Sequence, residues 1–216
     1  MTIRAKLYAA IVMTVLGPVV TIGVALAAFA TLGDRFDDVA RRGAGQSLAL
    51  QLKFAVTDLN GWQTAYGYDG GRSRPKFEAA AARTRSLIAR VDRRATAAPD
   101  RRLVVTLSGA FRAFMALDRD AYRALRAGRA GETKRLLLGP EIAHFETMAR
   151  AADQLATLQD RRARAASREF REARRNARRE LVAVAIGAGV VIVLLLITVQ
   201  DVVRLALERR SERDAA

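Results

Sequence analysis

The residues best suited to chemistry lie in one short stretch of the chain. Acid, amide, indole and phenol groups occur there within about two and a half turns of a predicted helix; they are Asp58, Asn60, Trp62, Gln63 and Tyr66. Asp58 lies four residues before Trp62, and Asn60 three before Gln63, so each pair shares a helix face. This spacing favours a small polar pocket that binds a ligand between helices. It also fits a partly buried hydrogen-bond network that fixes how the helices pack.

A second stretch, residues 161–180, holds nine arginines and three acidic residues. A solvated helix close to anionic lipid headgroups is the simplest interpretation, because arginine side chains reach along a surface and attract such headgroups. The sharper alternative is a site for a small anionic ligand, since the guanidinium fork fits carboxylate and phosphate. Nucleic acid is not expected as a partner, because Phe170 is the only aromatic residue in the stretch.

Signatures of enzymes are missing from the 216 residues. Cysteine is absent, which excludes disulfides, thiolate metal sites and a cysteine nucleophile. His144 is the only histidine, and no phosphate-binding loop, HExxH or GxSxG motif occurs. We therefore expect no enzymatic activity, no cofactor and no metal site.

Two stretches lack charge although 27% of the chain is charged and the net charge is +15. Residues 7–33 would form roughly 39 Å of helix between the first and the last apolar residue, and residues 181–200 roughly 30 Å. Both lengths suffice for a hydrocarbon core of about 30 Å, so two transmembrane helices are predicted. An alternative for the first stretch is a cleaved secretory signal, since Arg4 and Lys6 precede it and Ala28-Phe29-Ala30 resembles a cleavage site.

Small residues one turn apart mark both predicted spans. In the first span they are Gly23 and Ala27, and in the second they include Ala183, Gly187 and Gly189. Such spacing lets helices approach closely. It therefore predicts either a contact between the two spans or a contact with a second copy of the chain in a homodimer.

The basic residues before the first span favour a cytoplasmic N-terminus for a two-pass protein of the cell membrane. Two spans then return the C-terminus to the cytoplasm. Arg174 to Arg179 argue against this orientation, but long translocated segments largely escape the charge rule. The expected segments are a cytoplasmic N-terminus (1–6), a first span (7–33), an extracytoplasmic domain (34–180), a second span (181–200) and a cytoplasmic tail (201–216).

The domain between the spans reads as helix throughout. Apolar residues recur every three or four positions, alternation typical of strands is absent, and alanine makes up about a fifth of the chain. Gly70-Gly71, Pro99, Gly128 and Gly139-Pro140 divide the domain into helices near 34–68, 75–97, 100–127 and 140–180, with a short helix before Gly139. Asp100 is expected to cap the third of these. The predicted fold class is all-α, an antiparallel up-down-up-down four-helix bundle continuous with the two spans.

This order of parts resembles the sensor region of bacterial methyl-accepting chemotaxis proteins. The local likeness is the run Asp58-Leu59-Asn60-Gly61-Trp62-Gln63-Thr64-Ala65-Tyr66, together with the break at Leu136-Leu137-Leu138-Gly139-Pro140 before Phe145-Glu146-Thr147-Met148. The resemblance covers residues 1 to about 205 and is loose. It implies a sensor for chemotaxis or transmembrane signal transduction, dimeric through helix packing, that signals by displacement of a helix through the second span.

Members of that family continue into a HAMP linker and a cytoplasmic coiled coil, whereas this chain has sixteen residues after Gln200. The chain is therefore expected to be either a piece of a receptor or a sensor without its own output. The alternative function is a structural or interaction protein that associates with full-length receptors. Membrane lipid, a second copy, other receptor subunits and a small anionic ligand are the expected partners.

Overall fold

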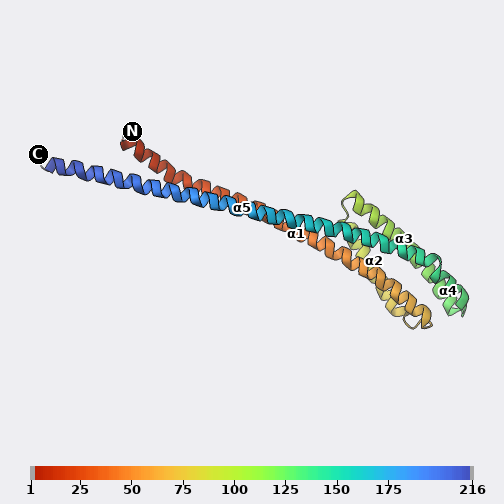
Figure 1. Ribbon diagram of the computed structural model, residues 1–216. Helices are drawn as coiled ribbons and strands as arrows, with labels where there is room; N and C mark the ends of the chain where they lie inside the picture. Colours follow the sequence, from red (N-terminus) through yellow and green to blue (C-terminus); the bar gives the residue numbers. More distant parts are fainter. Residues whose placement is uncertain (1–2, 215–216) are drawn as a thin grey trace. The chain divides into compact units, whose positions relative to one another are not determined.

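The structure is a computed structural model that describes the backbone of residues 3–214 and the side chains of Tyr8, Val12, residues 14–201, Val203 and Arg204. The described residues form helices with short connections, and no strand occurs among them. The helices are α1 (Ile3–Tyr68), α2 (Arg74–Arg94), α3 (Ala98–Arg126), α4 (Ala130–Leu138) and α5 (Pro140–Asp214) (Figure 1). The predicted all-helical class is therefore confirmed.

The two longest helices run without interruption from the predicted spans into the domain between them. Pro18 lies inside α1 and does not end it. The short helix expected before Gly139 is present as α4. Residues 1–2 and 215–216, at the ends of the expected segments 1–6 and 201–216, lie outside the described residues.

The chain divides into two compact units. One unit is Asp38–Ser167, and the other combines Met1–Asp37 with Arg168–Ala216. This division into units does not test the expected domain bounds of 34–180, which stay a prediction. Both described ends of the chain belong to the second unit, called the span unit below.

A single apolar core joins four helices of the unit Asp38–Ser167, called the bundle below. Leu52 and Leu59 of α1, Phe77 of α2, Phe114 of α3 and Met148 of α5 all lie in this core with side chains that are almost fully buried. Burial of each such side chain contributes about 1.5–3 kcal/mol. These residues belong to the apolar stripes that recur every three or four positions in the sequence.

Polar contacts fix how α1 and α5 lie within the bundle. Gln46 Nε2 donates to Asp160 Oδ1 over 2.7 Å, and Lys53 Nζ lies 2.6 Å from Asp153 Oδ1. Gln63 Nε2 donates to Glu141 Oε1. As the residue number rises along α1 it falls along α5, so the two helices run antiparallel in this unit.

The start of α3 differs from the expectation. Ala97 is the N-cap residue and no side chain caps the helix, so the prediction that Asp100 caps α3 is wrong. Asp100 is buried instead, and its Oδ2 lies 2.6 Å from Nη1 of Arg162 on α5. A buried carboxylate gains more from a guanidinium partner than from free backbone amides at a solvated helix end.

In the span unit, α1 and α5 each contain a stretch that is long and apolar enough to cross a membrane. The 18 most apolar consecutive residues of each stretch include no buried residue. Ala28 and Ala177 are the buried apolar residues of this unit among the described side chains. The exposed remainder is rich in Val, Ile and Leu, as expected of a surface that contacts lipid.

Candidate functional site

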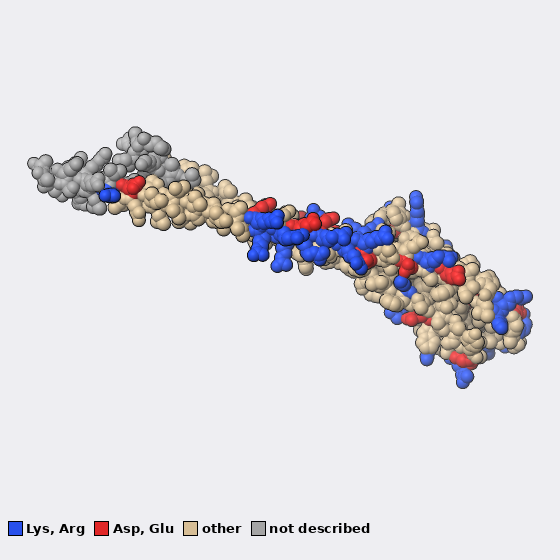
Figure 2. All heavy atoms as spheres, in the orientation of Figure 1, with Lys and Arg blue, Asp and Glu red and all other residues tan. Residues whose placement is uncertain are grey.

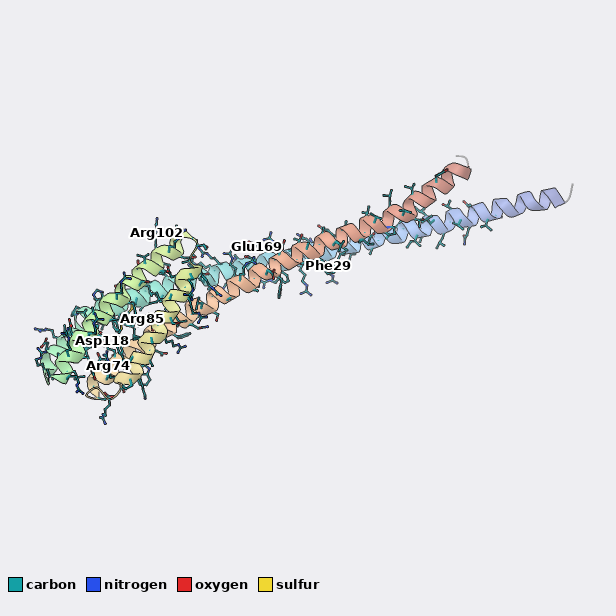
Figure 3. The ribbon with its side chains drawn as sticks, turned by 180° about the vertical axis from the view of Figure 1, so that it is seen from behind. Phe29, Arg74, Arg85, Arg102, Asp118 and Glu169 are labelled. Atoms are coloured by element: carbon teal, nitrogen blue, oxygen red, sulfur yellow. The ribbon has the colours of Figure 1, made fainter. Side chains whose placement is uncertain are left out.

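A buried polar network lies where α1 ends and α2 begins (Figure 3). Asp118 of α3 is fully buried, and Tyr66 of α1 donates its hydroxyl proton to Asp118 Oδ1. Arg74 Nη1 lies 2.8 Å from Asp118 Oδ2 and donates to Asp118 Oδ1 over 3.0 Å. A buried carboxylate is tolerated only with such partners, so the three side chains form one unit.

Three aromatic rings surround the guanidinium group of Arg74. Its Cζ lies 5.1 Å from the ring centroid of Tyr66, 4.7 Å from that of Phe77 and 4.4 Å from that of Tyr122. A cation held over ring faces is attracted by the negative charge of those faces, more strongly where water is excluded. Arg74 is therefore held by charge and by stacking at the same time.

The turn between α1 and α2 places Arg74 there. Gly70 and Gly71 have φ angles of 70° and 94°, a region that side-chain-bearing residues rarely adopt. The backbone N–H of Arg74 donates to Gly71 O over 3.1 Å and so begins α2 directly after the reversal. Glu78, one turn further along α2, accepts from Arg74 Nε over 3.0 Å.

Glu141, in the first turn of α5, is a second fully buried acid. Gln63 of α1 donates to its Oε1, and its Oε2 has no hydrogen-bond partner among the described residues. Burial raises the pKa of Glu141 to about 9, the charge of Asp118 adds to this, and Arg74 opposes it. Glu141 is therefore a neutral carboxylic acid at pH 7.

Burial also governs the ionisation of the rest of the network. It raises the pKa of Asp118, while the hydrogen bond from Tyr66 and the charge of Arg74 oppose that rise. It raises the pKa of Tyr66 as well, and the adjacent Asp118 charge adds to the effect. Burial alone would lower the pKa of Arg74, but Asp118 and Glu78 outweigh it and the pKa is raised. Arg74 therefore stays charged and Tyr66 stays protonated.

A cavity of about 290 Å³ lies beside this network. Its walls come from the last turns of α1, from α3, from α4 and from the first turn of α5. The polar side chains at its surface are Asn60, Gln63, Thr64, Tyr68, Thr133 and Lys134, and the apolar ones include Leu125, Leu137 and Ile142. A concave site with apolar walls and a few polar groups is the usual form of a small-molecule site.

The structure distributes the five residues singled out in the sequence over three environments. Asn60 and Gln63 line the cavity, and Tyr66 is buried in the network with Asp118. Asp58 and Trp62 lie in a separate groove between α1 and α2, where Lys76 Nζ is 4.5 Å from the Trp62 ring. The shared faces of the helix were correctly expected, but the five residues do not surround one pocket.

Sequence reasoning missed Arg74, Asp118 and Glu141. Asp118 continues the apolar stripe of α3, since it lies four residues after Phe114 and three before Ala121. Glu141 likewise lies four residues before Phe145, whereas Ile142, the expected start of that stripe, is 42% exposed. An acidic residue at a position of an apolar stripe indicates a buried polar network, and both Asp118 and Glu141 occupy such positions.

The small residues of the spans do not mediate a contact between the spans in this structure. Gly23, Gly187 and Gly189 have open space where a side chain would lie, and Ala183 is exposed. Ala27 lines a groove between α1 and α5 but is itself exposed. The alternative, that these residues contact a second copy of the chain, stays a prediction.

Chemically, the network can hold helices in register, because its buried acids bond to side chains of other helices. Among the described residues, no three His, Asp or Glu side chains lie together in a way that could hold a metal ion. Comparisons of the chain with protein-family models, with curated proteins and with solved structures found no match.

Proposed function

We propose that the chain is a membrane-anchored, chemoreceptor-like sensory module. In this proposal residues 34–180 form an antiparallel up-down-up-down four-helix bundle outside the cell membrane. Residues 7–33 and 181–200 cross the membrane, and both termini are cytoplasmic. The observation that carries the proposal is the Gln63–Glu141 hydrogen bond, which joins the two helices that contain the apolar stretches.

The cavity beside that bond is the proposed ligand site. A ligand there would contact Gln63 near the end of α1 and Ile142 in the first turn of α5. Different affinity for two arrangements of these helices would shift their equilibrium. Helix displacements of about 1–2 Å are typical of such switches, and an uninterrupted α5 is suited to carry one into the second span.

The walls of the cavity favour a small ligand with an apolar body and an anionic group. Lys134 supplies the cationic group, and amides and hydroxyls supply donors nearby. Glu141, buried behind Gln63, is neutral at pH 7 and therefore does not repel an anion. Small anionic molecules of this kind are the proposed signal.

A homodimer is proposed through one face of α1, called the seam: Ala40, Gly43, Ser47, Leu50, Phe54, Thr57, Gly61, Thr64 and Tyr68. The steps along the seam alternate strictly between three and four residues, which is the heptad spacing of a two-helix coiled coil. No charged residue interrupts it, Leu50, Phe54 and Tyr68 are exposed, and Gly43 and Gly61 have open space beside them.

A second copy of the chain is the partner that fits the seam. Two copies inserted in the same membrane with the same orientation present parallel α1 helices to each other, so each seam residue meets its own counterpart. The same spacing continues backwards through the apolar stretch of α1, through Phe36, Gly33, Phe29, Leu26 and Ile22, which are all exposed.

Disulfide crosslinking tests this dimer cleanly because the chain has no cysteine of its own. Leu50, Phe54 and Gly61 are replaced by cysteine one at a time, and membranes that contain each variant are oxidised. Disulfide-linked dimers should form at all three positions. Val105 of α3 is 70% exposed and lies off the seam, so Val105→Cys is the matched control. Equal crosslinking at Val105, or none at the seam, would remove the support for a homodimer.

A structural or interaction protein that associates with full-length receptors is the second candidate function. The observation that favours it is the same seam, since a heptad face also fits a similar helix of another chain. Mixed disulfides between Phe54→Cys and a co-expressed receptor, without homodimers, would favour this alternative.

A further inference from the structure

Charged side chains of α5 separate by sign just before the second apolar stretch. The arginine face comprises Arg168, Arg171, Arg174, Arg175, Arg178 and Arg179, which are all exposed. At 100° per residue these six lie within about 140° of one another around the helix. Figure 2 shows basic side chains gathered beside a length of the molecule that lacks charge.

The acids of the same segment point elsewhere. Glu169, Glu172 and Glu180 line the groove between α5 and α1, and Glu169 Oε2 lies 2.6 Å from Arg35 Nη1. No arginine of the arginine face has an ion pair with any described residue. Six guanidinium groups therefore have no ion-pair partner among the described residues.

The position of these arginines along the helices matches the surface of a bilayer. The apolar stretch of α1 ends at Gly33, and Arg35 lies opposite Glu169, as Phe36 lies opposite Phe170. On α5 the apolar stretch begins only at Leu181. Residues 169–180, roughly 18 Å of α5, thus lie alongside the apolar end of α1.

The surroundings at that level are amphipathic. Leu26 and Phe29 of α1 are exposed by 65% and 67%, so apolar surface and arginines occur at the same height of the span unit (Figure 3). Hydrocarbon suits the first kind of surface, and phosphate suits the second. Arg174 to Arg179 lie within roughly 10 Å of Leu181, which is within reach of a headgroup layer for long side chains.

We propose that the arginine face is a binding site for anionic phospholipid headgroups. Guanidinium groups pair with phosphate oxygens through two parallel hydrogen bonds, and the surface negative charge of anionic lipid adds long-range attraction. Arg174, Arg175, Arg178 and Arg179 make the headgroup contacts. Arg168 and Arg171 lie further from the apolar stretch that begins at Leu181. They add a longer-range attraction, which salt screens. This inference rests on the membrane-crossing part of the proposed function and on no part of the sensory proposal.

Lipid selectivity in a reconstituted bilayer tests the inference. The full chain is placed in phosphatidylcholine bilayers that contain spin-labelled phosphatidylglycerol or spin-labelled phosphatidylcholine, and the motionally restricted fraction of each lipid is measured. The wild type should prefer phosphatidylglycerol by about fivefold, the equivalent of roughly one arginine–headgroup contact. The preference should fall as salt is raised from 0.05 to roughly 0.5 M.

The variant R174Q/R175Q/R178Q/R179Q should lose the preference. The control R90Q/R93Q/R112Q/R119Q removes the same charge from exposed, unpaired arginines of α2 and α3, and should keep it. Equal association of both lipids with the wild type would overturn the inference. So would loss of the preference in both variants, which would assign it to net charge alone.

Two further arms complete the test. If the quadruple glutamine variant does not fold, two other measurements test the lipid preference. They are the salt titration of the wild type and the lipid preference of R174K/R175K/R178K/R179K, which keeps the charge. Inorganic phosphate tests for a soluble-anion site. If phosphate bound the lipid-free protein at these arginines, and also displaced the labelled lipid from the reconstituted protein, the lipid assignment would be overturned. Because the bilayer is symmetric, the outcome does not depend on the topology or on signalling.

Discussion

Gln63 and Glu141 share a hydrogen bond between the last turns of α1 and the first turn of α5, although 78 residues separate them in the sequence. Both are buried, and the carboxyl group is neutral at pH 7 because burial raises its pKa to about 9. The contact lies beside the cavity and on the two helices that continue into the apolar stretches. Changes at this bond therefore have a continuous helical route to the proposed spans.

Replacement of Glu141 by Gln should change how stability depends on pH. The folded protein keeps the Glu141 proton up to about pH 9, whereas the unfolded chain releases it near 4.5. The unfolded state thus binds fewer protons between these values, and the free energy of unfolding falls as pH rises, by at most about 1.4 kcal/mol per unit. Glu141→Gln removes this loss, so the variant should be the more stable at pH 8. Thermal melts followed by circular dichroism from pH 5 to 9 measure it; identical slopes for both proteins would refute the role of Glu141.

Removal of the Asp118 carboxylate should be strongly destabilising. It breaks a buried ion pair and leaves Arg74 with the exposed Glu78 as its remaining ion-pair partner, so the cost should approach about 3–5 kcal/mol. Asp118→Ala with Arg74→Met should recover part of that loss, because the buried guanidinium group is then removed together with its buried partner. The control is Asp120→Ala, which breaks the exposed Arg123–Asp120 pair on the same helix and should cost about 1 kcal/mol or less. Equal losses at Asp118 and Asp120 would show that the network does not stabilise the bundle.

A charge in the seam should weaken the dimer. Phe54→Lys places an ammonium group at the centre of the proposed helix contact, and the dimer dissociation constant should rise roughly tenfold or more. Val105→Lys is the control, since Val105 is similarly exposed on α3. Sedimentation equilibrium in detergent compares the two. A dimer unaffected by Phe54→Lys would place the contact elsewhere.

Gly67 offers a test of the packing at the cavity. A Cβ atom there would come within 2.8 Å of Leu137 Cδ1, so Leu137, a cavity residue, must move. Gly109 in α3 has open space instead, and Gly109→Ala should gain about 0.5–1 kcal/mol from helix propensity. Gly67→Ala should gain less or lose stability. Chemical denaturation of both variants measures the difference, and equal gains would mean that the α1–α4 contact is looser than described.

Much of the helical framework could be predicted from the sequence, because it depends on local signals. Nothing in residues 34–68 or 140–180 breaks a helix, so α1 and α5 were expected to continue from the apolar stretches. Gly70-Gly71 and Gly139-Pro140 mark connections that the structure also has. The antiparallel arrangement of the whole bundle, its orientation in a membrane and the dimer stay predictions.

The site was less predictable because its partners come from four helices. Tyr66 and Gln63 were found from their spacing in one helix, but Asp118 and Glu141 contact them only after folding. Asp100 was assigned to a helix cap from its local position, whereas its partner Arg162 is 62 residues away. Local spacing cannot supply such pairs, although an acid within an apolar stripe does indicate where one is needed.

Labelling of cysteines from outside the cell tests the central claim, that two helices cross a membrane and carry the bundle on its outer side. Val105→Cys reports on the bundle, and Ser211→Cys on the tail after the second apolar stretch. With a membrane-impermeant maleimide, Val105→Cys should react in intact spheroplasts, and Ser211→Cys only after the membrane is opened. The reverse pattern would place the bundle in the cytoplasm, and recovery of the protein in the soluble fraction without detergent would contradict the membrane anchor itself.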